Sequence, residues 1–338
     1  PFLAVCLTVS HRYVYCQIWE NDMNIRQGTN INHNYDNFNF WQIDLKELPS
    51  RGRLYPKNAK IKARSMSVLE VKFLATLVPA NATNICNELL EKCTILENFS
   101  YDDLILADRE FLIFWIRLNS FINSNGFIIT IPECSGCKKK IEYTVKLLNL
   151  EFKYLDRPFV NSVYLSDLDI TLPVKIPRYR DSSLIVEDDI DEVCLWIDTD
   201  NSMEEKYTFV SNLTANDFMT LKSHIDDNYC GVIKEMTIEC PHCGRTHNVK
   251  IEINDQNLFN NVDLSQILET ITRIAKYSNL QITNDWSWVE VEVEQQIINK
   301  MIEEENQANQ KEIAKAKSQM PAMPHGVSKP SMPSMPHF

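Results

Sequence analysis

The chain has 338 residues, 44% of them hydrophobic, which supplies enough apolar surface for a core that needs no disulfide support. Its net charge of -12 repels a phosphate backbone and its apolar runs are too short to cross a membrane, so we expect neither a nucleic-acid nor a membrane partner. The ten cysteines lie at irregular spacings in a long chain, which indicates free or metal-bound thiols in a reducing compartment.

The first 44 residues are predicted to form an N-terminal arm. Residues 24–41 are rich in Asn and aromatic side chains without a sustained period. Such a segment is typical of a chain end that becomes ordered on a partner or on the domain behind it. The different composition of residues 1–22 favours Met23 as the natural start.

Residues 45–160 are predicted to form an α+β subdomain that opens with the sequence LPSRGRLYP at residues 48–56. Two prolines, a glycine and a serine around Leu-Tyr predict a tight loop, and a short strand at residues 60–63 follows it. Ser67 then stands three residues before Glu70, a capping-box pattern that predicts the start of a helix.

Two further helices are predicted in the same subdomain. Apolar residues at helical spacing predict a helix over residues 82–93. The next helix, over residues 102–121, contains the sequence FLIFWI and is apolar enough to be buried on most sides.

A helix, a strand, a Cys-x-x-Cys turn and a second strand occur twice, in residues 108–148 and 214–253, which indicates an internal duplication. Apolar and polar residues alternate on both sides of each turn, as in a β-hairpin with one buried face. The second copy forms a predicted subdomain of residues 213–258. The cysteines of the two copies are offset by 106 residues and are Cys134 and Cys137, then Cys240 and Cys243.

The segment that connects the two copies, residues 161–212, is predicted to be β-rich and acidic. It alternates apolar and polar residues in short pieces interrupted by two prolines. The acidic run at residues 187–192 is typical of a solvated loop.

Beyond the second hairpin, an amphipathic helix is predicted within residues 259–284 and a long helix within residues 285–318. The tail, residues 319–338, carries four Met-Pro pairs that exclude a helix. The long helix has a narrow apolar stripe, which is typical of a helix docked on a partner. The residues predicted to bind that partner are Val289, Val293, Ile297 and Met301.

Two Cys-x-x-Cys turns supply the four thiolates that structural zinc prefers, because each tight turn directs both sulfurs inward. The predicted zinc ligands are Cys134, Cys137, Cys240 and Cys243. Four protein ligands leave no open position for water or substrate, so we expect the ion to hold the fold together. The predicted fold class is α+β, with duplicated helix and Cys-x-x-Cys hairpin units forming a zinc-ribbon-like site and with long terminal arms.

Other interpretations of these turns stay open. A redox role is disfavoured because a thioredoxin-type Cys-x-x-Cys opens a helix, whereas these turns lie between two strands. The thiols could also be reduced without a metal. His242 and His247 either replace one thiolate in a mixed site or face solvent. The remaining cysteines are interpreted as small buried side chains: Cys6, Cys16, Cys86, Cys93, Cys194 and Cys230.

The sequence offers little for catalysis. It contains no glycine-rich phosphate loop, no Gly-x-Ser-x-Gly elbow and no His-Glu-x-x-His motif. We therefore expect a protein that is not an enzyme.

The order of these motifs resembles the baseplate-hub protein family of T-even-like contractile-tailed bacteriophages. The similarity runs from residue 45 to residue 155 and rests on the loop, the buried helix and the first hairpin, with CPHCG of the second hairpin also similar. The matching positions are Leu48, Pro49, Ser50, Gly52, Tyr55, Cys134 and Cys137.

The resemblance implies a structural or assembly component of the tail baseplate of the virion, made in the host cytoplasm. It also implies other baseplate hub proteins as partners, together with the end of the tape-measure protein, and an oligomer within an assembly. Two alternatives are a zinc-ribbon nucleic-acid-binding protein, for which Lys138, Lys139, Lys140 and Arg245 supply local positive charge, and a thiol or metal enzyme.

Overall fold

The fold is seen in a computed structural model of the chain. It describes residues 39–122, 126–131, 133–184, 188–251, 253–259 and 262–319. The predicted arm up to residue 38, the Met23 start, two cysteines of the arm and the Met-Pro tail lie outside the described residues.

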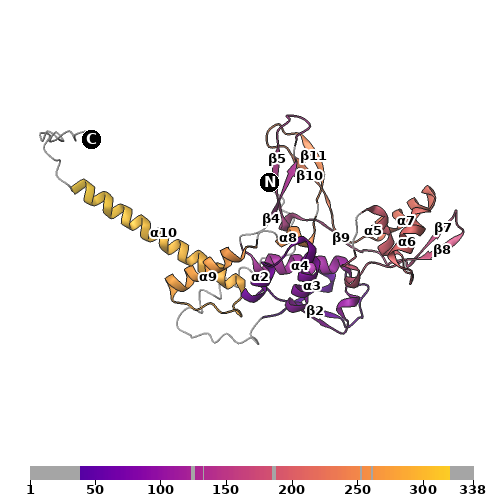
Figure 1. Ribbon diagram of the computed structural model, residues 1–338, viewed down its shortest axis with the longest axis horizontal. Helices are drawn as coiled ribbons and strands as arrows, with labels where there is room; N and C mark the ends of the chain where they lie inside the picture. Colours follow the sequence, from indigo (N-terminus) through magenta and orange to yellow (C-terminus); the bar gives the residue numbers. More distant parts are fainter. Residues whose placement is uncertain are drawn as a thin grey trace, which may run out of the picture. The chain divides into compact units, whose positions relative to one another are not determined.

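Helices and small antiparallel sheets make up the described residues, so the predicted α+β class is confirmed (Figure 1). The largest sheet has the strand order β1-β2-β3, with β1 at Trp41–Ile43, β2 at Lys60–Ala63 and β3 at Thr94–Glu97. The end of the predicted arm is ordered on the domain behind it, because β1 pairs with β2 and buries Ile43. The predicted subdomain boundaries farther along stay a prediction.

The first two helices begin where the sequence predicts. α2 (Val68–Leu74) has Ser67 as its N-cap, and the capping box with Glu70 is complete. The Glu70 carboxylate also accepts two hydrogen bonds from the buried Arg64 guanidinium, which holds the pKa of Glu70 below its usual value against the effect of burial. α3 (Ala82–Cys93) has the predicted bounds, and its apolar face is buried.

The third helix, α4 (Leu106–Ser120), is buried along most of its length, as predicted. It begins four residues later than the predicted start at 102, because Tyr101–Asp103 forms a 3-10 turn and Leu104 is extended. The other 3-10 turns are Leu45–Glu47, Pro79–Asn81, Leu147–Asn149 and Tyr179–Asp181.

The LPSRGRLYP loop is held on α4 by one buried carboxylate, that of Asp108. It accepts hydrogen bonds from the Ser50 backbone N–H at 2.9 Å and from the hydroxyls of Ser50 and Tyr55, and Tyr55 Oη accepts from the Ile105 N–H at 3.0 Å. Burial raises the pKa of Asp108 to about 6, although these donors oppose the shift. Gly52 adopts φ +68°, and a Cβ there would lie 2.7 Å from Leu45 Cβ. The loop motif is therefore explained by this anchor and by the turn at Gly52.

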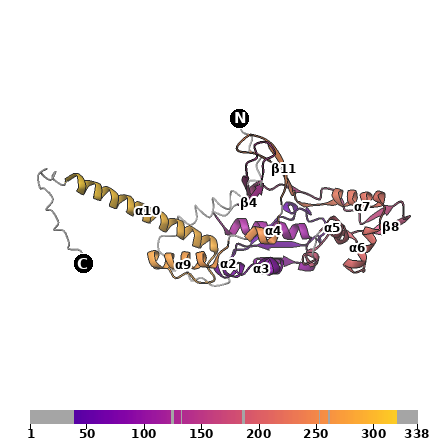
Figure 2. The same cartoon turned by 45° about the horizontal axis from the view of Figure 1, so that its top comes forward.

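The two predicted hairpins are present and lie side by side (Figures 1 and 2). The first consists of β4 (Gly126–Ile131) and β5 (Ile141–Lys146) and follows α4. The second consists of β10 (Glu235–Glu239) and β11 (Thr246–Lys250) and follows α7 (Ala215–Asn228). A short pairing of β6 (Phe152–Lys153) with β9 (Gly231–Val232) ties the exit of the first hairpin to the entry of the second.

The connection at residues 161–212 is less β-rich than predicted. One hairpin forms, from β7 (Ser162–Leu165) and β8 (Ile170–Pro173), but α5 (Asp189–Trp196) and α6 (Met203–Ser211) are helices. The prediction of a solvated acidic loop is wrong from Asp188 onward. The Asp188 side chain accepts hydrogen bonds from the N–H groups of Ile190 and Asp191 and so caps α5. The acidic residues that follow stabilise the positive end of the helix dipole.

After the second hairpin, the chain forms the short helix α8 (Asp255–Phe259), the predicted amphipathic helix α9 (Leu264–Ser278) and the predicted long helix α10 (Trp288–Gln319). α9 and α10 pack together, and Ile267, Ile274, Val291 and Ile298 are buried. α10 continues past α9, and its residues 303–315 are exposed (Figures 1 and 2).

Candidate metal centre

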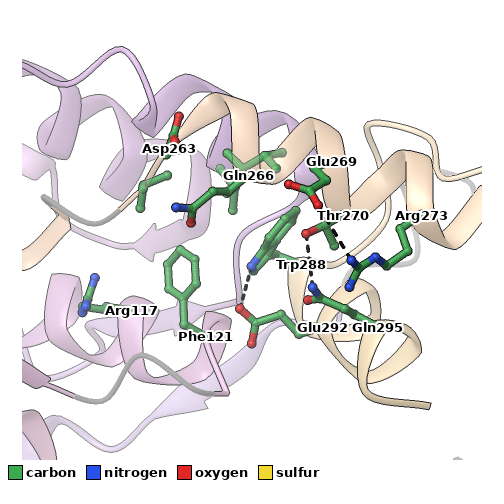
Figure 3. Close-up of a pocket in the computed structure, with 13 residues that line it drawn as sticks. Arg117, Phe121, Asp263, Gln266, Glu269, Thr270, Arg273, Trp288, Glu292 and Gln295 are labelled. Carbon is green, nitrogen blue, oxygen red and sulfur yellow. Dashed lines mark hydrogen bonds and ion pairs between the residues drawn. The ribbon is translucent and has the colours of Figure 1, made fainter. Parts of the chain in front are cut away.

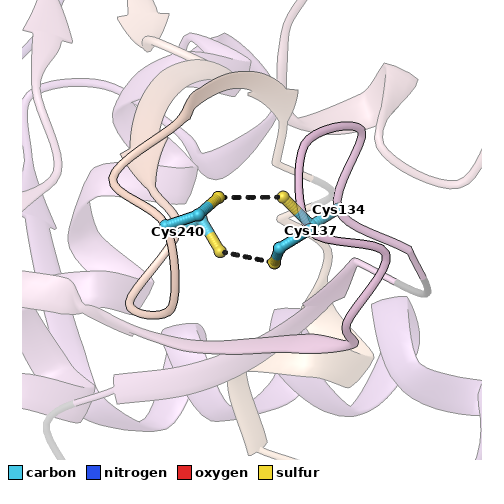
Figure 4. A group of neighbouring side chains, drawn as sticks. Cys134, Cys137 and Cys240 are labelled. Atoms are coloured by element: carbon cyan, nitrogen blue, oxygen red, sulfur yellow. Dashed lines mark hydrogen bonds between the residues drawn. The ribbon is translucent and has the colours of Figure 1, made fainter.

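The four predicted ligands come together between the tips of the two hairpins (Figure 4). Cys134 Sγ lies 3.7 Å from Cys243 Sγ, and Cys137 Sγ lies 3.8 Å from Cys240 Sγ. All four sulfurs lie within 4.8 Å of one another. Residues more than one hundred positions apart in the sequence therefore share one site.

These separations match the geometry of a metal-thiolate centre. A zinc-sulfur bond of about 2.3 Å in a regular tetrahedron places the sulfurs about 3.8 Å apart. Four sulfur donors in this arrangement suit zinc, whereas Mg²⁺ and Ca²⁺ prefer oxygen donors. The residues present therefore fit a tetrahedral metal ion.

The two turns have the same backbone structure. Cys134 N–H donates to Lys139 O and Cys240 N–H donates to Arg245 O, both at 2.8 Å. The residue after the second cysteine adopts positive φ in each turn, 63° at Lys138 and 72° at Gly244. The internal duplication thus extends to the hydrogen bonds that direct the sulfurs inward.

Gly136 lies where the second turn approaches the first. A Cβ at this position would lie 3.3 Å from Cys243 Sγ and 3.0 Å from Arg245 Cδ. The absence of a side chain at Gly136 lets the two turns approach each other. The spacing of the cysteines in the sequence gives no sign of this role of Gly136.

We expect Gly136→Ala to weaken zinc binding about tenfold, because overpacking of this kind costs roughly 1–3 kcal/mol. Chelator competition on the purified protein measures this change. Ser135→Ala is the matched control, since Ser135 is exposed in the same turn. An alanine variant that binds zinc as tightly as the parent would show that the turns tolerate a wider separation.

The thiols of the site differ in their electrostatic surroundings. The backbone N–H of Cys137 lowers the pKa of Cys134 while burial opposes it, and the Gly136 N–H and the His247 ring bring this pKa to about 5. For Cys243, the Arg245 N–H lowers the pKa, but burial and hydrogen bonds with the other three thiols raise it to about 11. Of these two thiols, Cys134 is therefore the one that more readily forms the thiolate that binds a cation.

The second hairpin has a further anchor beyond the sulfurs. Arg109 of α4 donates to both carboxylate oxygens of Asp255 in α8, at 3.1 and 2.7 Å, and to Asn87 Oδ1 at 2.6 Å. The Arg109 side chain is buried. The second hairpin is thus flanked by two anchors, the pairing of β6 with β9 before it and this ion pair after it.

The remaining predicted site residues fall in three groups. His242 is exposed, whereas His247 lies with Nε2 3.3 Å from Cys134 Sγ. The four cysteines outside the centre that the structure describes are buried, as expected, and burial raises the pKa of each thiol: Cys86, Cys93, Cys194 and Cys230.

On α10, Val289, Val293 and Ile297 are half-buried and Met301 is 59% exposed, so the predicted stripe runs along the edge of the packed face.

A pocket of about 400 Å³ lies between the end of α4, α9 and α10 (Figure 3). Its polar side chains bond to one another: Trp288 Nε1 donates to Glu292, and Gln295 Nε2 donates to Thr270 Oγ1. Its described lining includes no histidine, cysteine or serine. The bond between Gln295 and Thr270 links α10 to α9, whereas the bond between Trp288 and Glu292 lies within α10.

A family model described as T4 bacteriophage base plate protein matches residues 41–260, about two thirds of the chain. The chain belongs to this family. The match includes both Cys-x-x-Cys hairpins and extends well beyond the resemblance at residues 45–155, which it confirms. α9 and α10 lie outside it.

The family places the protein in the tail baseplate of the phage virion as a structural component. No curated protein and no solved structure is significantly similar to the chain. Among the described residues, no helix is both long and apolar enough to cross a bilayer.

Proposed function

We propose that this baseplate protein is a non-enzymatic component of the baseplate hub whose two hairpins are joined by a structural zinc ion. The observation that carries the proposal is the convergence of four thiol sulfurs from two distant turns at the spacing of a tetrahedron. The bound ion supplies a cross-link between the hairpins, and Cys134, Cys137, Cys240 and Cys243 would hold it.

The first experiment measures the metal in protein purified without added metal or chelator. Elemental analysis is expected to give one zinc per chain. Quantitative mass spectrometry of purified particles is expected to show the chain at a fixed small ratio to other tail proteins. A metal-free native protein would contradict the zinc proposal, and absence from particles would contradict a hub component that stays in the virion.

The surface proposed to bind other baseplate hub proteins, or the end of the tape-measure protein, is the edge of α10. Val289, Val293 and Ile297 are only half-buried there, and Met301 is exposed next to them. Apolar side chains that remain accessible beside a packed helix face are suited to a partner contact within an assembly. The exposed continuation at residues 303–315 extends this surface away from the core.

We expect the double variant Ile297→Glu and Met301→Glu to reduce incorporation into baseplates about tenfold, because charges replace apolar contacts at an interface. Complementation of infection by a phage lacking the wild-type chain, followed by particle composition, measures this. Lys300→Glu, which also adds negative charge to α10 at an exposed position, is the control. Normal incorporation of a stably folded double variant would place the partner contact elsewhere.

The two alternative functions receive less support. Around the metal centre, Lys138 pairs with Glu133 at 2.8 Å and Lys140 pairs with Glu142 at 2.6 Å, which offsets the local positive charge available to nucleic acid. Retention of nucleic acid in a low-salt filter assay would restore that alternative. For an enzyme, four thiolates would fill a tetrahedral ion and leave no position for substrate.

A further inference from the structure

The two Cys-x-x-Cys units differ at a position of the second strand that lies next to the sulfurs. The offset of 106 residues that aligns the cysteines also aligns Ile141 of β5 with His247 of β11. Ile141 is buried and packs with Cys134 and Cys240. His247 instead places Nε2 3.3 Å from Cys134 Sγ. An apolar contact in one copy is thus replaced by a polar one in the other.

We propose that His247 is a positioning residue of the metal centre, which donates a hydrogen bond from Nε2–H to the Cys134 thiolate and thereby strengthens metal binding. The inference rests on the zinc centre proposed above. A metal-bound thiolate has no proton to give, so the contact requires the proton on the histidine nitrogen. The Gly136 N–H donates to the same sulfur at 3.4 Å.

The chemistry of the centre explains why such a donor is useful. Four thiolates around a divalent cation leave a net charge of about two negative units, since each cysteine contributes one. Donors to the sulfurs spread this charge and fix the sulfur positions. On the first hairpin the corresponding position is filled by Ile141, which excludes water but cannot donate. The two halves of the centre are therefore stabilised by different means.

The geometry places His247 outside the ligand set. The four sulfurs lie within 4.8 Å of one another and already supply a tetrahedral set, and the His247 nitrogen is not part of that group. The ring is held by β11, where His247 pairs with Ile238 of β10. His242 lies within the second Cys-x-x-Cys turn, between Cys240 and Cys243. Its side chain is exposed, which makes it the control for His247.

The test uses the full chain with Zn²⁺ and Co²⁺ as probes. Chelator competition is expected to show zinc affinity lower by about tenfold to a hundredfold in His247→Ile, the range found when an outer partner of a metal ligand is removed. His247→Gln, which keeps a side-chain N–H, is expected to recover part of the loss. His242→Gln is expected to bind like the parent. The Co²⁺ absorption spectrum is expected to show four sulfur donors in every variant.

Each contrary result separates the inference from the zinc proposal. If the parent binds neither Zn²⁺ nor Co²⁺, the metal centre itself is wrong, and the role of His247 falls with it. If the parent binds but His247→Ile has unchanged affinity, only the hydrogen-bond role is overturned. A parent Co²⁺ spectrum with nitrogen coordination that His247→Ile abolishes would overturn it too, because the histidine would then be a ligand.

A long-range proton–nitrogen correlation NMR spectrum of the zinc-loaded protein shows which ring nitrogen of His247 carries the proton, and this result does not depend on zinc affinity. The proton of His247 is expected on Nε2, in the direction of Cys134. A spectrum with the proton on Nδ1 alone would overturn the proposal, because Nε2 could then not donate to the sulfur.

Discussion

Replacing Cys240 by serine is expected to remove zinc from the protein and to lower its melting temperature by roughly 10 °C. A ligand at a free concentration one thousand times its Kd stabilises the native state by about 4 kcal/mol, and the variant loses this contribution. For a domain of 150–250 residues each kcal/mol shifts the midpoint by about 2–4 °C, and a chain of 338 residues lies toward the low end of this range. Elemental analysis and calorimetry measure the two changes on the same sample.

Hydrogen exchange locates the effect of Cys240→Ser. Loss of protection is expected in β4–β5 and β10–β11, because the centre joins these hairpins, while α2 to α4 stay protected. Cys194→Ala is the control: that thiol is buried away from the centre, so the variant is expected to keep one zinc per chain. A Cys240→Ser variant that melts like the parent would mean that the hairpins need no metal.

The second large effect is expected from Asp108→Ala. The substitution leaves the Ser50 N–H and the hydroxyls of Ser50 and Tyr55 without their acceptor in a buried site. Each unsatisfied buried group costs about 1–3 kcal/mol, so the loss of an acceptor for three donors is expected to lower the free energy of unfolding by at least about 3 kcal/mol. Urea denaturation followed by fluorescence measures it.

Two variants show whether the loss comes from this network. Tyr55→Phe removes one donor and leaves the Ile105 N–H unpaired, so it is expected to cost about 1–3 kcal/mol. Asp102→Ala is the matched control on the exposed surface and is expected to change stability by less than about 0.5 kcal/mol. If Asp108→Ala resembled Asp102→Ala, water rather than Asp108 would satisfy the loop.

Much of this fold could be predicted where local chemistry decides the structure. The capping box at Ser67 and Glu70 fixes the start of α2, and apolar spacing gave the bounds of α3. The repeated Cys-x-x-Cys turns predicted both hairpins and the convergence of their four sulfurs, because tight turns and metal-ligand spacing are local patterns.

The errors occur where a local pattern permits two outcomes. An acidic run suits a solvated loop, but the same residues also stabilise the first turn of α5 once Asp188 caps it. The partners of Asp108 lie more than fifty residues away, so no local pattern reveals the network.

At the candidate metal centre, the four cysteines that come together were predictable, and the role of the residues around them was not. The sequence pointed to His247 only as a replacement for one thiolate or as a solvent-facing residue, and its contact with Cys134 Sγ is found in the structure. The need for a glycine at Gly136 follows only from the packing of the second turn against it.

The distance along the chain between the two turns also sets an order of events during synthesis. Cys137 and its partner Cys240 are 103 residues apart. At about 5–20 residues per second, a ribosome adds the second pair roughly 5–20 s after the first. During that interval the first hairpin offers the proposed ion only two of its four thiols. The proposed ion can therefore join the two copies only after the helices between them have been made, so its role would be to complete folding and not to start it.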